Sequence, residues 1–306
     1  MTNQESKENR EVQPDSWHGC YDDSWQGLIV PEAFSHPAKM SYNLTRRIFK
    51  HALFEGWIKP GQVVCDPFGG IGSTGLIGAH FGLQVICVEL KQKFVDLARQ
   101  NFERHRKSIE SFSHFGKPLF PVIIQGDSRR LSEIISKVNL IVSSPPFSNT
   151  EGTADDNFRY HGKKLGTTGK HYGESEGQLG NKQDQTFWQA AKIIVEQCHQ
   201  ILKPGGMAIW VVKAFVRNKK KVDFPGDWRR LCESIGFETV CEHHAMLVKE
   251  TRETGIFGDE IIKKKERKSF FRRLAENKGS PKIDFEVVLC CQKMIKATED
   301  NSIKGV

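Results

Sequence analysis

The chain has 306 residues, of which 38% are hydrophobic and 27% are charged, and its formal net charge is +8. This length allows one large core or two modest ones. No apolar run approaches the ~20 residues that a membrane span requires. The first residues lack the apolar core of a signal peptide, which predicts a cytoplasmic protein.

The excess positive charge is concentrated in two segments. Residues 213–221 hold five basic and no acidic side chains, and residues 249–282 hold eleven basic and six acidic ones. This distribution favours a surface that faces a polyanion. A solvated charged face is the alternative.

The eight cysteines are scattered without any Cys-x-x-Cys pair, and Cys290 and Cys291 lie in an apolar, strand-like run. We therefore expect reduced, partly buried thiols, and neither disulfides nor a metal site.

The first half of the chain alternates strands and helices. Residues 1–16 are polar and are predicted to form a disordered tail, followed by a single domain over 17–299. Apolar residues recur at helical spacing within 42–54. The further expected elements are strands at 62–65, 83–88 and 121–125, a helix that opens at the glycines after the first strand and runs to about 81, and a helix at 91–106.

The second half continues this alternation around two irregular segments. Strands are expected at 138–142, 207–212, 239–248 and 285–291, and helices at 187–202 and 227–235. Residues 148–184 hold seven glycines and no apolar run, which predicts a long, mobile functional loop. Residues 250–284 form a basic insertion. The pattern predicts a Rossmann-like α/β fold with a mostly parallel seven-stranded sheet and helices on both faces.

A glycine pattern follows the first of these strands. Gly70-x-Gly72-x-x-Gly75 allows a tight turn and a close backbone approach, and Glu89 lies at the distance expected for a ribose ligand. The pattern alone also suits a nicotinamide enzyme. Asp66 at the strand end argues against that, because its charge repels a pyrophosphate and suits a cation such as a sulfonium.

Acids end three successive strands, at Asp66, Glu89 and Asp127. This series suits a cofactor with an amino-acid tail, a ribose and an adenine. The alternative is that Glu89 and Asp127 are helix N-caps, and each can play both roles.

Ser144-Pro145-Pro146-Phe147 ends the strand at 138–142. The prolines hold the chain extended at the carboxyl end of a strand, where doubly wound sheets bind ligands. A hydroxyl, exposed carbonyls and an aromatic ring there suit a flat polar ring. A proline-stiffened loop is the alternative.

The segment 66–75 together with Ser144–Phe147 resembles the amino-methyltransferase family of DNA methyltransferases, and His36-Pro37-Ala38-Lys39-Met40 resembles that family's other cofactor segment. The resemblance covers roughly residues 28–215. The motif order differs from many relatives with this glycine loop, which place the Pro-Pro motif first, and Phe147 stands where Tyr is frequent.

The resemblance implies a Rossmann-like methyltransferase that uses S-adenosylmethionine. The cofactor residues it implies are His36, Pro37, Lys39, Asp66, Pro67, Phe68, Gly70, Gly72, Glu89 and Asp127. Catalysis is assigned to Ser144, Pro145, Pro146 and Phe147, with Ser144 and the Pro145 carbonyl accepting hydrogen bonds from an exocyclic amine and Phe147 stacking on the base.

The implied substrate is double-stranded DNA with a flipped base. Ser before Pro-Pro favours cytosine N4, and adenine N6 is the alternative. Two further hypotheses are an RNA amine methyltransferase and a non-catalytic nucleic-acid-binding relative. Phosphate and stacking contacts are expected from a basic, aromatic segment, namely Lys263, Lys264, Lys265, Lys268, Phe270, Phe271, Arg272 and Arg273. A helix with solvated lysines and core-facing phenylalanines is the alternative there.

Overall fold

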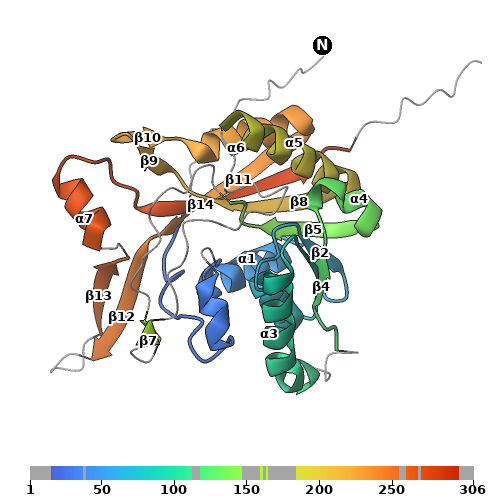
Figure 1. The fold of residues 1–306 in the computed structure, drawn as a ribbon, viewed down its shortest axis with the longest axis horizontal. Helices are drawn as coiled ribbons and strands as arrows, with labels where there is room; N and C mark the ends of the chain where they lie inside the picture. Colours follow the sequence, from blue (N-terminus) through green and yellow to red (C-terminus); the bar gives the residue numbers. More distant parts are fainter. Residues whose placement is uncertain are drawn as a thin grey trace, which may run out of the picture.

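The computed structural model describes residues 15–36, 39–111, 118–146, 159–160, 163–164, 184–254, 260–267 and 270–295. Its centre is an eight-stranded sheet in the order β1-β11-β14-β8-β5-β2-β3-β4 (Figure 1). In chain order, these strands are β1 Asp15–Trp17, β2 Val63–Asp66, β3 Gln84–Glu89, β4 Val122–Gln125, β5 Val138–Ser143, β8 Leu202–Val212, β11 Phe237–Met246 and β14 Phe285–Lys293.

Five of these strands, β4, β3, β2, β5 and β8, run parallel, and β14 is antiparallel to both of its neighbours, β8 and β11. This sheet confirms the predicted Rossmann-like α/β fold. The predicted number of seven strands was wrong, because Asp15–Trp17 pairs in parallel with β11 as an additional edge strand. Asp15 and Ser16 therefore belong to the sheet and not to a disordered tail.

Helices cover both faces of the sheet. α1 (Tyr42–Phe54), α2 (Ser73–His80) and α3 (Gln92–Ser111) pack on one face, and α4 (Leu131–Ile134), α5 (Asp184–Ile201) and α6 (Phe224–Ile235) pack on the other. The period of two along a strand divides the core accordingly. In β5, Leu140 and Val142 face the first group of helices, and Ile141 faces the second. Among the described residues, no helix is long and apolar enough to cross a membrane.

The remaining elements are short. Two 3₁₀ helices, η1 (Pro31–Ser35) and η3 (Ser128–Arg130), and the strands β6 (Arg159–Tyr160) and β7 (Lys163–Lys164) interrupt the larger elements. β6 and β7 are the described part of the predicted 148–184 loop, apart from Asp184, which begins α5. Residues 203–206, between the helix predicted at 187–202 and the strand predicted at 207–212, are part of β8, whose pairing with β5 shifts register between Val138 and Leu140.

Both basic segments form hairpins. β9 (Phe215–Arg217) pairs with β10 (Lys220–Val222), and β12 (Val248–Thr254) pairs with β13 (Glu260–Glu266), which is followed by α7 (Phe270–Asn277). The second hairpin and α7 lie in the connection between β11 and β14. Figure 1 shows both hairpins on the same side of the molecule, with β12 and β13 projecting away from the central sheet.

The order in which the chain adds strands to the sheet reverses at β2. From β2 the chain adds β3 and β4 on one side, and it then returns to add β5 and β8 on the other. Open α/β sheets bind ligands at such a switch point, outside the carboxyl ends of the strands. The fold therefore brings the loop after β2 and the segment after β5 to the same crevice.

Candidate active site

The glycine loop joins β2 to α2 in a conformation that requires glycine. Gly70 has φ 51° and Gly72, the N-cap of α2, has φ 81°. A Cβ at Gly72 would lie 2.5 Å from the ring of Phe102, and one at Gly70 would lie 3.1 Å from Nε2 of His36. Positive φ and close neighbours both exclude larger residues here. The glycines therefore let the loop turn tightly against Phe102 and His36.

The predicted His-Pro segment lies directly beside this loop. The buried His36 ring packs edge-on against Phe94, with 4.4 Å between ring centroids. Lys39 Nζ donates to the carbonyls of Phe34 and His36, at 3.2 and 2.6 Å. Burial, with a smaller repulsion from Arg267, lowers the pKa of Lys39 to about 8. Pro37, the other predicted residue of this segment, lies outside the described residues.

Asp66 is buried at the end of β2 and is turned toward the protein. Its Oδ1 accepts hydrogen bonds from the Phe68 N–H at 3.0 Å and from Ser143 Oγ at 2.5 Å, and Thr74 also donates to it. Burial raises its pKa, although these donors oppose the shift. Pro67 and Phe68 turn the chain into the glycine loop. Asp66 thus joins the loop to the end of β5, and its predicted contact with a cationic cofactor tail stays a prediction.

Glu89 ends β3 next to the glycine loop. One carboxylate oxygen accepts from the Gly70 N–H at 3.0 Å, and the other accepts from the Lys91 N–H at 2.9 Å. Burial raises the pKa of Glu89. A carboxylate has about four lone-pair sites, so each oxygen retains room for one more donor. That geometry suits the two hydroxyls of a ribose.

Asp127, beyond the end of β4, is engaged mainly with Arg129. Its side chain caps η3 by accepting from the Arg129 N–H at 3.0 Å, and both oxygens bind the Arg129 guanidinium. Partial burial raises the pKa of Asp127, but the hydrogen bonds from Arg129 outweigh burial and lower it. The N-cap alternative is therefore correct for Asp127, and its role toward an adenine stays a prediction.

Ser144 and Pro145 follow β5 at the neighbouring strand end. Ser144 Oγ donates to the Val211 carbonyl of β8 at 3.0 Å, and Ser144 is half-buried. This bond uses the hydroxyl proton and leaves the lone pairs of the oxygen able to accept. Pro145 is buried and Pro146 is half-buried. Phe147 lies outside the described residues.

Three buried polar residues that the sequence analysis did not single out hold these loops together. Asn101 of α3 donates to the Ile71 carbonyl at 3.0 Å and accepts from the Val30 N–H at 2.9 Å. Ser128 donates to the Pro67 carbonyl at 2.6 Å, and Ser143 binds Asp66. Asn101 was detectable as a polar residue on the apolar face of α3, whereas nothing local marked the two serines.

The residues at the ends of β2 and β3 fit S-adenosylmethionine. Gly70 and Gly72 have the positive φ values of a tight glycine loop, and Glu89 presents two further acceptor sites beside Gly70. These are the features expected of a site for a ribose.

The predicted nucleic-acid residues divide between two elements. Lys263, Lys264 and Lys265 are exposed on β13, and Arg273 is exposed on α7. The alternative assumed a single helix over this segment, and that alternative is wrong. Lys268 and the side chains of Phe270, Phe271 and Arg272 lie outside the described residues.

The register of this hairpin separates its lysines. Lys265 faces Lys249 and Lys263 faces Thr251, so these three lysines share one face of the ribbon. Lys264 faces Glu250 on the other side and forms an ion pair with it at 3.1 Å. One face of the hairpin is therefore more basic than the other.

A Rossmann-like sheet that brings a glycine loop, an acid at the end of the next strand and a Ser-Pro-Pro segment to neighbouring strand ends is the arrangement of the methyltransferases that the sequence resembles. The family model described as DNA methylase matches residues 1–100. The match confirms the resemblance over those residues, which include His36, the glycine loop and Glu89. It supports S-adenosylmethionine as the cofactor. Ser144 and the basic hairpin lie beyond it.

Among characterised proteins, a tRNA (guanine(10)-N2)-dimethyltransferase of Methanothermobacter thermautotrophicus is 28% identical over 123 residues. This alignment covers 40% of the present chain and 32% of that enzyme, so the match spans about a third of the relative's length.

Two solved structures are similar at low identity. TrmN of Thermus thermophilus has 16% identity and a TM-score of 0.46 over 86% of this chain and 52% of that one. Magnesium protoporphyrin IX methyltransferase of Synechocystis has 12% identity and a TM-score of 0.45 over 82% and 79%. The strand order, and not these similarities, establishes the fold.

Proposed function

We propose that this protein transfers a methyl group from S-adenosylmethionine to an exocyclic amine of a nucleic-acid base. The observation that carries the proposal is the position of Ser144 and Pro145 beside the glycine loop, at the switch point of the sheet. The cofactor supplies an electrophilic methyl on a sulfonium. The protein supplies binding, orientation and hydrogen-bond acceptors for the amine.

The Ser144 side chain is suited to this role. An exocyclic amine is a poor nucleophile because its lone pair is delocalised into the ring, and acceptors on its N–H bonds favour the pyramidal form. Ser144 Oγ donates its own proton to the Val211 carbonyl, so its lone pairs remain able to accept a hydrogen bond from the amine. The Pro145 carbonyl is the second acceptor, and Phe147 is the stacking ring by resemblance.

We propose double-stranded DNA with a flipped base as the substrate, and cytosine N4 as the atom methylated. The match to the DNA methylase family model and the exposed lysines of β13 support DNA. A two-stranded ribbon also fits the major groove of a duplex. Adenine N6 requires the same acceptors and is the alternative within DNA.

The second candidate is an amine methyltransferase of RNA. The characterised relative at 28% identity is an enzyme of this kind, and guanine N2 is also an exocyclic amine. The proposed roles of Ser144 and Pro145 are the same for both substrates.

The test is to incubate the purified protein with S-adenosylmethionine and either mixed-sequence unmethylated DNA or unmodified tRNA, and to identify modified nucleosides by mass spectrometry. N4-methylcytosine from DNA is the expected product. N6-methyladenine would change the base, and modification of tRNA alone would replace DNA by RNA. Absence of methylation on both, with no binding of cofactor, would contradict the enzyme assignment.

A further inference from the structure

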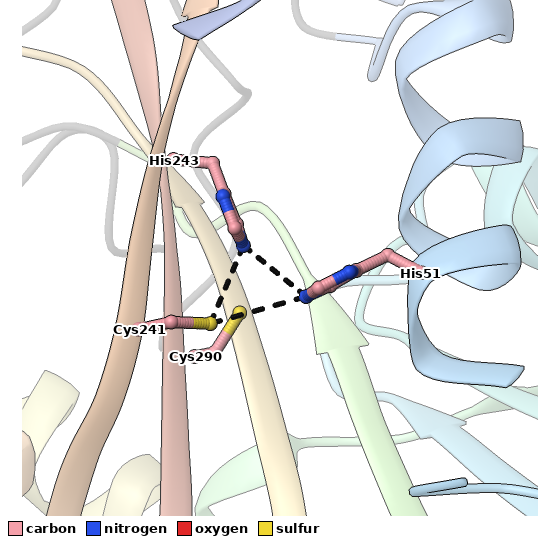
Figure 2. A group of neighbouring side chains, drawn as sticks. All are labelled: His51, Cys241, His243 and Cys290. Carbon is pink, nitrogen blue, oxygen red and sulfur yellow. Dashed lines mark hydrogen bonds between the residues drawn. The ribbon is translucent and has the colours of Figure 1, made fainter. Parts of the chain in front are cut away.

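A second cluster of polar side chains lies where α1 meets the antiparallel part of the sheet. His51 comes from the last turn of α1, Cys241 and His243 come from β11, and Cys290 comes from β14. One nitrogen of each His and both sulfurs all lie within 4.8 Å of one another. Figure 2 shows the four side chains converging, His51 from the helix and the other three from the sheet.

Strand register explains why these residues meet. Cys241 and Cys290 are directly opposite each other in the β11–β14 pair. His243 lies two residues beyond Cys241 and therefore projects from the same face of the sheet. α1 covers this face, and its last turn places His51 over the two strands.

The spacing of the donor atoms is close to that of a tetrahedral metal site. Nε2 of His243 lies 3.1 Å from Nε2 of His51 and 3.3 Å from Cys241 Sγ, and His51 Nε2 lies 3.9 Å from that sulfur. Zinc bond lengths of about 2.0–2.1 Å to nitrogen and 2.3 Å to sulfur give tetrahedral edges of roughly 3.3–3.8 Å. These three distances differ from the tetrahedral edges by a few tenths of an ångström, and the remaining pairs of donor atoms, which involve Cys290, lie within 4.8 Å.

Both imidazoles are oriented as metal ligands are. Their Nε2 atoms face the centre of the cluster, and their Nδ1 atoms face carboxylates, at 3.8 Å from Glu55 for His51 and at 3.9 Å from Asp15 for His243. A carboxylate behind the imidazole is a common second partner of a metal-bound histidine. Nδ1 of His243 is buried and has no hydrogen-bond partner in the described part of the chain.

The cluster is shielded from water. The Trp17 ring stacks on His243, with 4.3 Å between centroids and 19° between planes, and its edge meets His51. The Arg47 guanidinium lies 4.7 Å from the centroid of the Trp17 ring. Cys290 is fully buried and His243 is 8% exposed.

We propose that His51, Cys241, His243 and Cys290 bind one structural Zn²⁺ ion. Two thiolates and two imidazoles in tetrahedral arrangement are a ligand set that selects zinc. All four positions are occupied by protein, so the ion has no open site for a substrate. Its role is to fasten the end of α1, the helix that follows the His36 segment, to β11 and β14. This reverses the expectation of no metal site.

A disulfide between Cys241 and Cys290 is the competing arrangement, because the two residues are cross-strand partners. It leaves unexplained why two imidazoles direct Nε2 at the sulfurs. The two arrangements exclude each other, since a disulfide sulfur is not a thiolate ligand.

The test is to purify the full chain without immobilised metal or chelator and to measure its metal content by mass spectrometry. About one zinc per chain is expected. After a chelator has removed the zinc and Co²⁺ has been added, the visible spectrum should show the bands of tetrahedral cobalt and of thiolate charge transfer. The melting temperature should fall when the chelator removes the zinc and should recover when Zn²⁺ is added back.

The zinc content of single-substitution variants tests which residues bind the ion. Cys241→Ser and His51→Gln should each lose most of the bound zinc. Cys232→Ser is the matched control, because Cys232 forms a hydrogen bond with Cys291 on the opposite face of the sheet. This variant should retain the zinc. Any of three outcomes would overturn the proposal. The first is that the wild-type protein holds no more zinc than Cys241→Ser, and the second is that the wild-type protein gives no tetrahedral cobalt spectrum. The last is a Cys241–Cys290 disulfide in peptides of the protein prepared without reductant. The second and last of these outcomes need no variant.

Discussion

Ser143 Oγ donates a hydrogen bond of 2.5 Å to Asp66 Oδ1, and these are the last residues of β5 and β2. The bond joins the strand that leads into the glycine loop to the strand that leads into Ser-Pro-Pro. Because neither side chain is exposed to water, the relative position of the two loops depends on this pair.

Ser143→Ala should destabilise the protein by about 1–3 kcal/mol, because it removes a donor from a buried carboxyl group. The affinity for S-adenosylmethionine should fall as well, since the glycine loop loses a support. Urea unfolding and calorimetric titration measure the two effects. Ser234→Ala, at an exposed serine of α6, is the control and should change neither. Equal stability of Ser143→Ala and the wild type would show that the bond does not organise the site.

Ser144→Ala should lower turnover by roughly 10–100-fold, which corresponds to one hydrogen bond to a group that gains charge. The dissociation constant of the cofactor should stay nearly unchanged, because Ser144 bonds to Val211 and not to the glycine loop. Single-turnover methylation and cofactor titration separate the two quantities. A comparable loss in cofactor affinity would remove Ser144 from its assigned role. Phe147→Ala should behave as Ser144→Ala does.

Glu89→Gln should have the opposite pattern, with cofactor affinity reduced about tenfold or more and turnover at saturating cofactor changed much less. The amide retains one acceptor oxygen and turns a donor toward the N–H of Gly70 or Lys91. Titration of cofactor binding by calorimetry measures the effect. Unchanged affinity would mean that the carboxylate serves only to hold the loop.

Replacement of Lys263 and Lys265 by Ala should weaken DNA binding and flatten its salt dependence. If each lysine contacts one phosphate, the slope of log K against log salt should become less steep by about 1.8. Lys264→Ala is the matched control, because that lysine lies on the other face in an ion pair with Glu250. Equal slopes for the double variant and the control would exclude this face as the phosphate-binding surface.

We expect Lys39 to make the free energy of unfolding depend on pH in the alkaline range. Its pKa in the folded protein is about 8, lowered by burial and by Arg267, whereas an unfolded lysine titrates near 10.4. Between these values the unfolded chain binds the additional proton, so the contribution of Lys39 to stability rises with pH and is least favourable below pH 8. Lys39→Met should remove this rise, whereas replacement of the exposed Lys50 of α1 should retain it. Urea unfolding from pH 7 to 10 tests the difference.

The residues around the switch point show how far the sequence determines the site. The apolar runs, the spacing of the glycines and the double proline are local signals, because strand and turn preferences act over a few residues. They predicted the Rossmann-like sheet and the segments that meet at its crevice. The positions of the strands in the sheet follow from rules of connection that are also independent of side-chain detail.

Tertiary structure decided what each of these groups contacts. Asp66 and Asp127 were assigned to a cofactor as acids at strand ends, and the fold engages them with Ser143 and Arg129. Cys241 and His51 are 190 residues apart and meet only because β11 lies beneath the end of α1. No local pattern encodes such a contact, since it depends on strand register and on which helix covers which face. The sequence predicted which segments meet at the switch point of the sheet, and packing determined which of their side chains are free to bind a ligand there.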